Sequence, residues 1–371
     1  MSFEEVLIEE NLGYRFLYYV IDGEKYASNV INLIAVECDT EIMIISDYFT
    51  FELPIININT FGNGIDSKIN YTDMTFTILN SGSDLIDISG GIRLRGNSTR
   101  SLPKKPYRIK FDKKQSLFGL TKAKSWVLLA DYLDPSGLHN YTALSLGGEM
   151  DGLSFTPTPN KVNVYLNGEY VGLYTLCEQV QENEGRINIE IEITEDMTQL
   201  KDYNFFISMD ASVVGDEDAI LDETYYYIPE YNQYFELKYP EKENFSSEEQ
   251  FFNFMTDLKA YTKYLLDIFN QRDVERIKSE VNLYSLADFL IIDEIMGETD
   301  HKYKSFNMYF TNTSSLEENG KINFGPIWDY DFCLYSPWTG TPNESFEKEQ
   351  METIFYSNDF YKAMVEIPEF L

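Results

Sequence analysis

Two aspartates in an apolar run could bind a divalent cation. Asp329 and Asp331 interrupt the otherwise apolar and aromatic stretch from Phe324 to Tyr335. Charges inside such a run are costly unless they are paired or bind a metal, and two carboxylates on one face of an extended segment suit a hard cation. The run predicts a metal site, although a pair of capping or salt-bridged aspartates would give the same pattern.

A second pair, Asp300 and Asn307, lies where a helical pattern passes into an aromatic, strand-like run. Phosphoryl transfer needs a carboxylate to orient the substrate hydroxyl and an amide oxygen to help hold Mg²⁺. An aspartate and an asparagine in a loop are more often turn formers. Taken alone, this pair therefore does not establish an active site.

A cationic segment offers a complementary site for an anion. Strand alternation places Arg93 and Arg95 on one face of their strand. The same alternation places Arg108 and Lys110 on one face of the next strand. A loop rich in Gly, Asn, Ser and Thr joins the two strands, and its N–H groups together with guanidinium groups suit phosphate oxygens. The alternative is a cationic sheet face that offsets the acidic remainder.

The charge of the whole chain is strongly negative. It has 29 basic and 62 acidic residues and a formal net charge of −33. Such a charge repels nucleic acid and anionic lipid and attracts a polycationic partner, unless it serves only solubility. Between Arg93 and Lys124, however, eleven basic residues accompany a single acid, Asp112. This positive island indicates a local site for a small anionic ligand.

Several classes of protein lack support in the sequence. The start, MSFEEVLIEE, carries acids where a secretory signal is basic, and no stretch approaches the roughly 20 apolar residues of a membrane span. We therefore expect a soluble protein that is cytoplasmic when made. Three widely spaced cysteines fit neither a disulfide framework nor a zinc site. His139 and His301 are too few and too scattered for a zinc site, and a G-x-S-x-G nucleophile motif is missing.

The elements that must position these residues are mainly strands in the first half. Runs beginning at Tyr14, Val30 and Ile42 predict a β-rich N-terminal extension. Asn167-Gly168 is a strong hairpin signal between two further strands. The strands expected outside the extension are 71–78, 91–95, 106–111, 126–130, 162–166 and 170–176.

Helical signals are fewer until the second half. One helix should have Asp134 as its N-cap, Pro135 as its first residue and Gly147 near its end. Capping boxes predict two more helices, after Ser246 and after Ser285. The order predicts an α+β fold with a β-rich N-terminal lobe and an α-rich C-terminal lobe. We divide the chain into an extension, 1–56, an N-lobe, 57–180, and a C-lobe, 181–371.

Five segments together resemble the spore coat protein H (CotH) kinase family. They are RGNSTR with KKPYRIKF, LADYLDPSGLHN, VYLNGEYVGLYTLCEQV, the Asp300–Asn307 segment with its aromatic tail, and PIWDYDF. They occur in the family's order, and five separate matches are far more specific than one. The resemblance implies an atypical, bilobal protein-kinase-like fold that uses ATP and Mg²⁺ or Mn²⁺. It is atypical because G-x-G-x-x-G is missing and WDYDF replaces D-F-G.

The resemblance also implies roles on the nucleotide side. Lys110 in YRIK resembles the lysine that contacts the α- and β-phosphates, with Arg95 assisting and Arg108 on the same strand face. Asn97 and Ser98 belong to a turn that resembles a phosphate-covering loop.

The remaining implied roles concern adenine, the metal and the acceptor. LCEQV resembles the connector between lobes, where backbone groups near Glu178 and Val180 could pair with adenine. Asp300 resembles the catalytic-loop aspartate. The implied metal ligands are Asn307, Asp329 and Asp331.

By this resemblance the protein is a transferase that moves the ATP γ-phosphate to Ser or Thr of basic, Ser-rich spore coat proteins and autophosphorylates. It would be made in the mother-cell cytoplasm during sporulation and then join the spore coat, without nucleic-acid or membrane partners. The acidic surface would concentrate basic substrates. Two alternatives stay open: a non-catalytic acidic scaffold that binds basic coat proteins, and a metal-dependent hydrolase using Asp300, Asp329 and Asp331.

Overall fold

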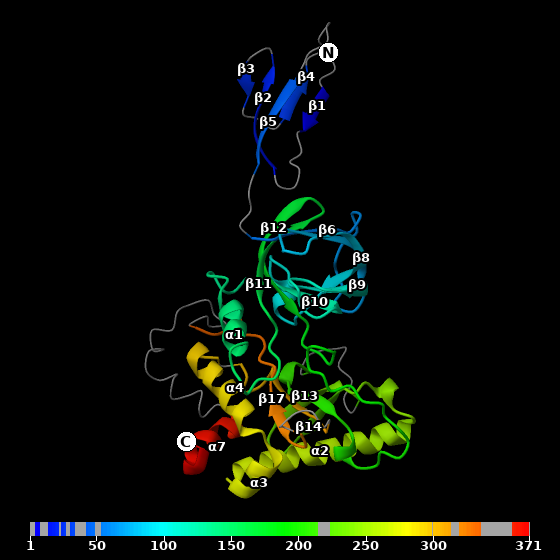
Figure 1. The fold of residues 1–371 in the computed structure, drawn as a ribbon, viewed down its shortest axis with the longest axis vertical. Helices are drawn as coiled ribbons and strands as arrows, with labels where there is room; N and C mark the ends of the chain where they lie inside the picture. The colour runs from blue at the N-terminus through cyan, green and yellow to red at the C-terminus, as the bar shows by residue number, and fades with distance from the viewer. Residues whose placement is uncertain are drawn as a thin grey trace. The chain divides into compact units, whose positions relative to one another are not determined.

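The computed structural model of the chain describes residues 4–7, 14–21, 24–26, 30–33, 42–48, 53–213, 223–298, 300–312, 319–334 and 358–370. The chain forms two compact units, residues 1–55 and 56–371. The first unit holds two small antiparallel sheets (Figure 1), which confirm the strands predicted from Tyr14, Val30 and Ile42. One sheet pairs β1 (Glu4–Leu7) with β4 (Val30–Leu33), and the other has β3 (Glu24–Tyr26), β2 (Tyr14–Ile21) and β5 (Ile42–Tyr48) in that order.

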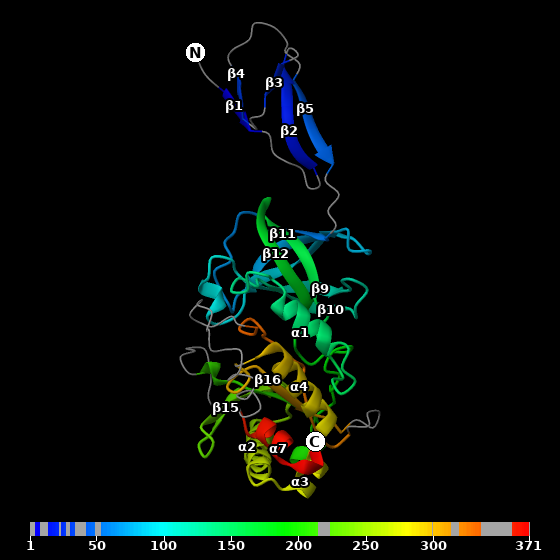
Figure 2. The ribbon, with the colours of Figure 1, turned by 90° about the vertical axis from the view of Figure 1, so that its left-hand side faces the viewer.

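Seven strands close into a barrel, visible in Figures 1 and 2. Along its strands, apolar side chains such as Ile92, Ile109 and Phe111 are buried in a common core. Their neighbours in sequence point outward, as the alternation predicts. In barrel order the strands are β10 (Ala123–Leu129), β12 (Glu169–Glu178), β11 (Asn160–Leu166), β6 (Ile55–Asn59), β7 (Thr72–Leu79), β8 (Leu85–Leu94) and β9 (Tyr107–Gln115).

The hairpin predicted at Asn167-Gly168 is confirmed. Leu166 pairs with Glu169, so a two-residue turn joins β11 to β12. Asn167 has φ 52° and Gly168 has φ 86°. Both values lie in the left-handed region, which Asn and Gly adopt more readily than other residues, and such turns match the twist of paired strands.

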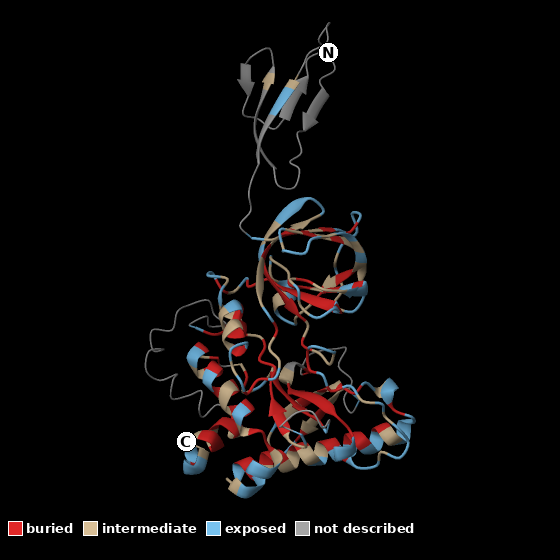
Figure 3. Ribbon diagram, in the orientation of Figure 1, coloured by how far each residue is buried: buried red, intermediate tan, exposed pale blue. Residues whose placement is uncertain are grey.

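A five-stranded sheet and several helices form the rest of the second unit, so the fold is α+β as predicted. Of this sheet the sequence indicated only the strand-like run at β16, because we expected mainly helices after residue 180. Figure 3 shows that its strands are largely buried, as are the inward faces of the helices. The strands, in order, are β14 (Tyr225–Ile228), β15 (Gln233–Tyr239), β13 (Phe205–Met209), β16 (Phe306–Phe310) and β17 (Ile322–Phe324).

The helices pack against this sheet and against one another. Helix α1 packs on α4, and α2 packs on α7, α3 and β14 (Figure 2). Among the described residues, no helix is long and apolar enough to cross a membrane. The helices are α1 (His139–Gly147), α2 (Glu248–Asn270), α3 (Val274–Glu280), α4 (Leu283–Met296) and α7 (Asp359–Glu366).

The predicted helix starts need correction, although α1 ends at Gly147 as expected. The Asp134 carboxylate is not the N-cap: it accepts the N–H of His139, 2.8 Å away, from a turn five residues earlier in the chain. Helix α2 is capped by Ser247, one residue later than predicted. Helix α4 is capped by Asn282, so the predicted start at Ser285 already lies inside it.

Candidate active site

One pocket is lined by residues of both the barrel and the five-stranded sheet. The barrel supplies the turn after β8 and the segment that follows β10. The sheet supplies Ser208 and Asp210 near the end of β13 and Lys238 of β15. Two polar segments complete the lining, 304–307 before and within β16 and 328–332 after β17. The pocket therefore joins parts of the chain that are far apart in sequence.

Most of the residues singled out from the sequence meet in this pocket. It brings together Arg95, Asn97, Ser98, Val180, Asn307, Asp329 and Asp331. Asp300, Arg108, Lys110 and Glu178 lie outside the lining that the described residues form.

The turn after β8 carries the cationic side of the pocket. Its second residue, Gly96, has φ 77°, and a Cβ there would lie 2.3 Å from Oγ1 of Thr99. The turn is therefore tight enough to need glycine. The Arg95 guanidinium lies 5.0 Å from the ring centre of Trp328, which immediately precedes Asp329. Cation–π contact thus links the cationic turn to the acidic segment across the pocket.

The two cationic strands pair, with Arg93 opposite Arg108 and Leu94 opposite Tyr107. The cations occupy the outer face of the barrel. Lys110 is exposed, and its ammonium lies 6.0 Å from the ring centre of Tyr71. Arg108 is half-buried, and this burial is the main cause that lowers its pKa. Its Nη2 donates to the side chain of Gln181 at 3.3 Å. Of the cations that the sequence placed on one face, Arg95 is the one in the pocket lining that the described residues form.

Lysines that we did not predict line the pocket instead. Lys104 donates to the carbonyl of Ala130 at 2.6 Å and also to the carbonyl of Leu173, and burial lowers its pKa. Lys304 lies 2.8 Å from Oδ2 of Asp300. Burial opposes the charge on Lys304, but Asp329 and Asp300 raise its pKa. Asp300 thus contacts the pocket through Lys304.

Asn307 and Asp329 have constrained geometry at the acidic side. Asn307 is 2% exposed, and its Nδ2 donates to the carbonyl of Pro326 at 2.8 Å, which fixes the orientation of the amide. Asp329 has φ 70°, a left-handed conformation that costs a non-glycine residue of order 1–3 kcal/mol. Its Oδ2 accepts the hydroxyl of Ser305 at 3.2 Å. Such strain is typical of functional sites.

The charge at this side fits a divalent cation. Burial, together with the nearby carboxylates of Asp329 and Asp131, raises the pKa of Asp331 to about 7. Within the described ranges, no group of three or more His, Cys, Asp or Glu could hold a metal ion. A cation would therefore depend on two carboxylates, the Asn307 oxygen, and phosphate or water, a set that Mg²⁺ commonly takes.

The two connector residues differ in environment. Glu178 is buried, and its carboxylate accepts the N–H of Thr158 at 2.8 Å. Val180 lines the pocket, and its carbonyl accepts Nε2 of Gln179 at 3.1 Å. Pairing of this connector with adenine stays a prediction.

A buried polar cluster lies behind the acidic segment. Asp293, which is fully buried, accepts hydrogen bonds from His301 Nδ1 at 2.9 Å, from Tyr330 at 2.7 Å and from Tyr361. Burial opposes protonation of His301, but Asp293 raises its pKa to about 10, so the second ring N–H donates to the carbonyl of Trp328 at 2.7 Å. His301 thus fixes the backbone immediately before Asp329. Asp293 is one of three acids in α4, with Asp288 and Glu294, and the sequence alone does not set it apart from the other two.

A cationic turn and a carboxylate pair in one pocket of an α+β fold define a candidate phosphate- and metal-binding protein. Residues 92–371 match the family described as CotH kinase protein. The match covers most of the chain, so the protein belongs to the CotH kinase family, as the sequence resemblance indicated. No curated protein matches the chain. Membership implies kinase activity and a connection with the spore coat.

Proposed function

We propose that the protein transfers the γ-phosphate of ATP to Ser or Thr hydroxyls of basic, Ser-rich spore coat proteins and also autophosphorylates. The observation that carries this proposal is the pocket in which Arg95 and its tight turn share a lining with Asn307, Asp329 and Asp331. Phosphoryl transfer needs these two parts: donors for phosphate oxygens and ligands for a cation that neutralises them. The barrel and the sheet-and-helix region would act as the two lobes of a kinase-like fold.

Each group of residues has a separate task in this mechanism. Asn307, Asp329 and Asp331 would hold Mg²⁺ or Mn²⁺, which when bound offsets the charge on the phosphates. Arg95 and the exposed residues Asn97 and Ser98 would bind phosphate oxygens from the opposite side.

Asp300 would orient the acceptor hydroxyl. Its backbone N–H donates to Oε1 of Glu298 at 2.6 Å, which holds the loop. Lys304 lies between Asp300 and the pocket, because it contacts the carboxylate and also lines the cavity. The carboxylate would therefore need to leave Lys304, or act beside it, when the acceptor binds.

The acidic surface supports the substrate class. A net charge of −33 attracts a polycationic chain over a distance of roughly a Debye length, about 8–10 Å at physiological salt. We further propose synthesis in the mother-cell cytoplasm and later incorporation into the spore coat.

Transfer of label from γ-labelled ATP tests this function. With Mg²⁺ and a basic, Ser-rich protein, we expect label on Ser or Thr of the substrate and on the enzyme itself. Asp329→Asn should abolish most of the transfer, whereas the exposed Asp112→Asn in β9 is a matched control that should retain it. Free labelled phosphate alone would favour a metal-dependent hydrolase. No turnover at all, with basic protein still bound, would favour a scaffold.

A further inference from the structure

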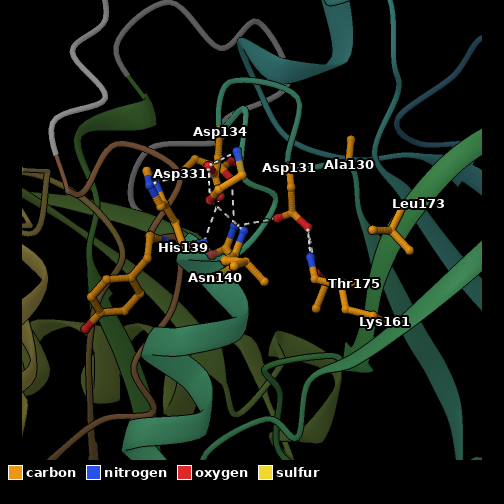
Figure 4. Close-up of polar contacts among 12 residues, drawn as sticks. Ala130, Asp131, Asp134, His139, Asn140, Lys161, Leu173, Thr175 and Asp331 are labelled. Carbon is orange, nitrogen blue, oxygen red and sulfur yellow. Dashed lines mark hydrogen bonds and ion pairs between the residues drawn. The ribbon is translucent and has the colours of Figure 1, made fainter. Parts of the chain in front are cut away.

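Helix α1 reaches the acidic side of the pocket through Asn140, its second residue. This side chain is 2% exposed. Its Nδ2 donates to Oδ1 of Asp331 at 2.6 Å and to Oδ1 of Asp131 at 3.1 Å (Figure 4). Its Oδ1 accepts the backbone N–H of Tyr330 at 2.9 Å. Both N–H groups and the oxygen of one amide are thus engaged, and two of the three contacts hold the segment that carries the candidate metal ligands.

Asp131 anchors the other end of these contacts to the barrel. It follows β10 and is 7% exposed. Its Oδ2 accepts Lys161 Nζ of β11 at 2.9 Å and Thr175 Oγ1 of β12 at 2.6 Å (Figure 4). A continuous series of hydrogen bonds therefore runs from the barrel through α1 to Asp331.

We propose that Asn140 is a positioning residue that fixes the Asp331 carboxylate for Mg²⁺, an inference that rests on the function proposed above. Two carboxylates, Asp131 and Asp331, would repel each other, and the amide lies between them and donates one N–H to each. Because Asn140 occupies Oδ1 of Asp331, Oδ2 is left for the cation. The hydrogen bond from the Tyr330 N–H fixes the backbone between Asp329 and Asp331. Asn140 therefore sets both the orientation of the Asp331 carboxylate and its spacing from Asp329.

Loss of this amide has a defined physical consequence. In Asn140→Ala the buried N–H of Tyr330 loses its acceptor, and the Asp331 carboxylate loses the donor that fixes its rotation. Removing a hydrogen-bond partner of a metal ligand typically weakens metal binding about 10- to 100-fold. We expect a loss of that size in Asn140→Ala. Binding of ADP without metal should change much less, because no pocket-lining atom is removed.

Direct metal binding is the measurement, with the full-length chain and saturating ADP. Bound Mn²⁺ is determined from the loss of the electron paramagnetic resonance signal of free Mn²⁺, relative to ADP alone. The matched control is His139→Ala, the preceding residue of α1, which contacts Asp134 at 3.4 Å and forms no hydrogen bond or ion pair with Asp331 in the described structure. This control should retain wild-type Mn²⁺ affinity. Asn140→Ser, which keeps one short donor, should fall between wild type and Asn140→Ala.

The outcomes separate this inference from the function on which it rests. If wild type fails to retain Mn²⁺ with ADP, the proposed metal site is wrong and the role of Asn140 fails with it. If wild type binds Mn²⁺ and Asn140→Ala binds it equally well, the positioning role alone is refuted. If Asn140→Ala does not fold, the Mn²⁺ affinity of Asn140→Ser tests the positioning role by the same comparison with wild type. Equal weakening by His139→Ala would mean that α1 acts only through its general stability.

Discussion

Replacing Glu298 by Gln should stabilise the second unit increasingly as the pH rises. Glu298 is 2% exposed, and burial raises the pKa of its carboxyl from 4.5 to about 8, with Asp293 adding to the shift and protonated His301 opposing it. Between these two values the unfolded chain has lost the proton and the folded protein still holds it. The free energy of unfolding of the wild type therefore falls as pH rises, by about 1.4 kcal/mol per unit. Gln carries no such titration.

The expected difference follows from these values. Relative to the Glu298→Gln variant, the free energy of unfolding of the wild type should be lower by about 1 kcal/mol at pH 5 and by about 3 kcal/mol at pH 7. This difference should level off above about pH 8. Urea unfolding of both proteins across this range measures it, since titrations common to both cancel in the difference. Gln keeps an oxygen that can accept the N–H of Asp300, so kinase activity should persist.

A matched control is Glu249→Gln, at an exposed position in α2. It reports the general effect of removing one negative charge from an acidic protein. A difference between wild type and Glu298→Gln that stays constant from about pH 5 to 8 would refute the reasoning, because it would show that Glu298 ionises alike in the folded and unfolded states.

Three further results are expected. Asp329→Asn should keep the fold but lose at least about 100-fold in label transfer, because half of the carboxylate pair for the cation is gone; near-normal transfer would remove Asp329 from the site. Arg95→Ala should raise the KM for ATP about tenfold, and Lys110→Ala should raise it less than about twofold, because Arg95 lines the pocket and Lys110 is exposed outside it. A larger effect of Lys110→Ala than of Arg95→Ala would restore the role that the family resemblance gives Lys110. The kcat/KM for an Arg/Lys-rich Ser peptide should fall steeply between about 50 and 500 mM salt, and that for a neutral Ser peptide should not; parallel curves would mean that the negative charge serves solubility.

Six of the seven barrel strands were predictable because they have one buried and one exposed face, whereas β6 and the closure of the strands into a barrel were not predicted. In β8 and β9, charged and apolar residues alternate, and this pattern gave both the strands and the face that the cations share. The pairing of the two strands and its register, with Arg93 opposite Arg108, come from the structure. Alternation gives no information on how far a pocket extends along a strand. It therefore could not show that the pocket lining would include Arg95 and exclude Lys110.

Most of the five-stranded sheet was not predicted, and β13 shows one physical reason. All five residues of β13 are buried, so this strand has no solvent face to create alternation. Short apolar runs of this kind read equally well as parts of a helix. β16 is buried throughout as well, but its aromatic composition still indicated a strand. The start of α1 was also misplaced, because Asp134 bonds the N–H of His139 across a turn and thus resembles an N-cap in sequence.

The site was predictable where one segment carried its own signal. Asp329 and Asp331 are acids within an apolar run, and Asn307 was found through spacing and resemblance. Asp131 and Asn140 belong to the segment LADYLDPSGLHN, which marked the family without suggesting a role. The role of Asn140 depends on contacts with a segment about 190 residues further along the chain, which no local pattern reveals.

The segment 328–331 concentrates features that a stable fold alone would avoid. Asp329 is in a left-handed conformation, and burial, together with two nearby carboxylates, raises the pKa of Asp331. Separate elements hold this segment in place: His301 donates to the carbonyl of Trp328, and Asn140 of α1 accepts the N–H of Tyr330. Local strain and like charge persist only where surrounding contacts determine the geometry. Because those contacts come from the barrel, α1 and the cluster around α4, the carboxylate pair takes its position only when the whole second unit has folded, and a bound cation would then relieve the repulsion that folding creates.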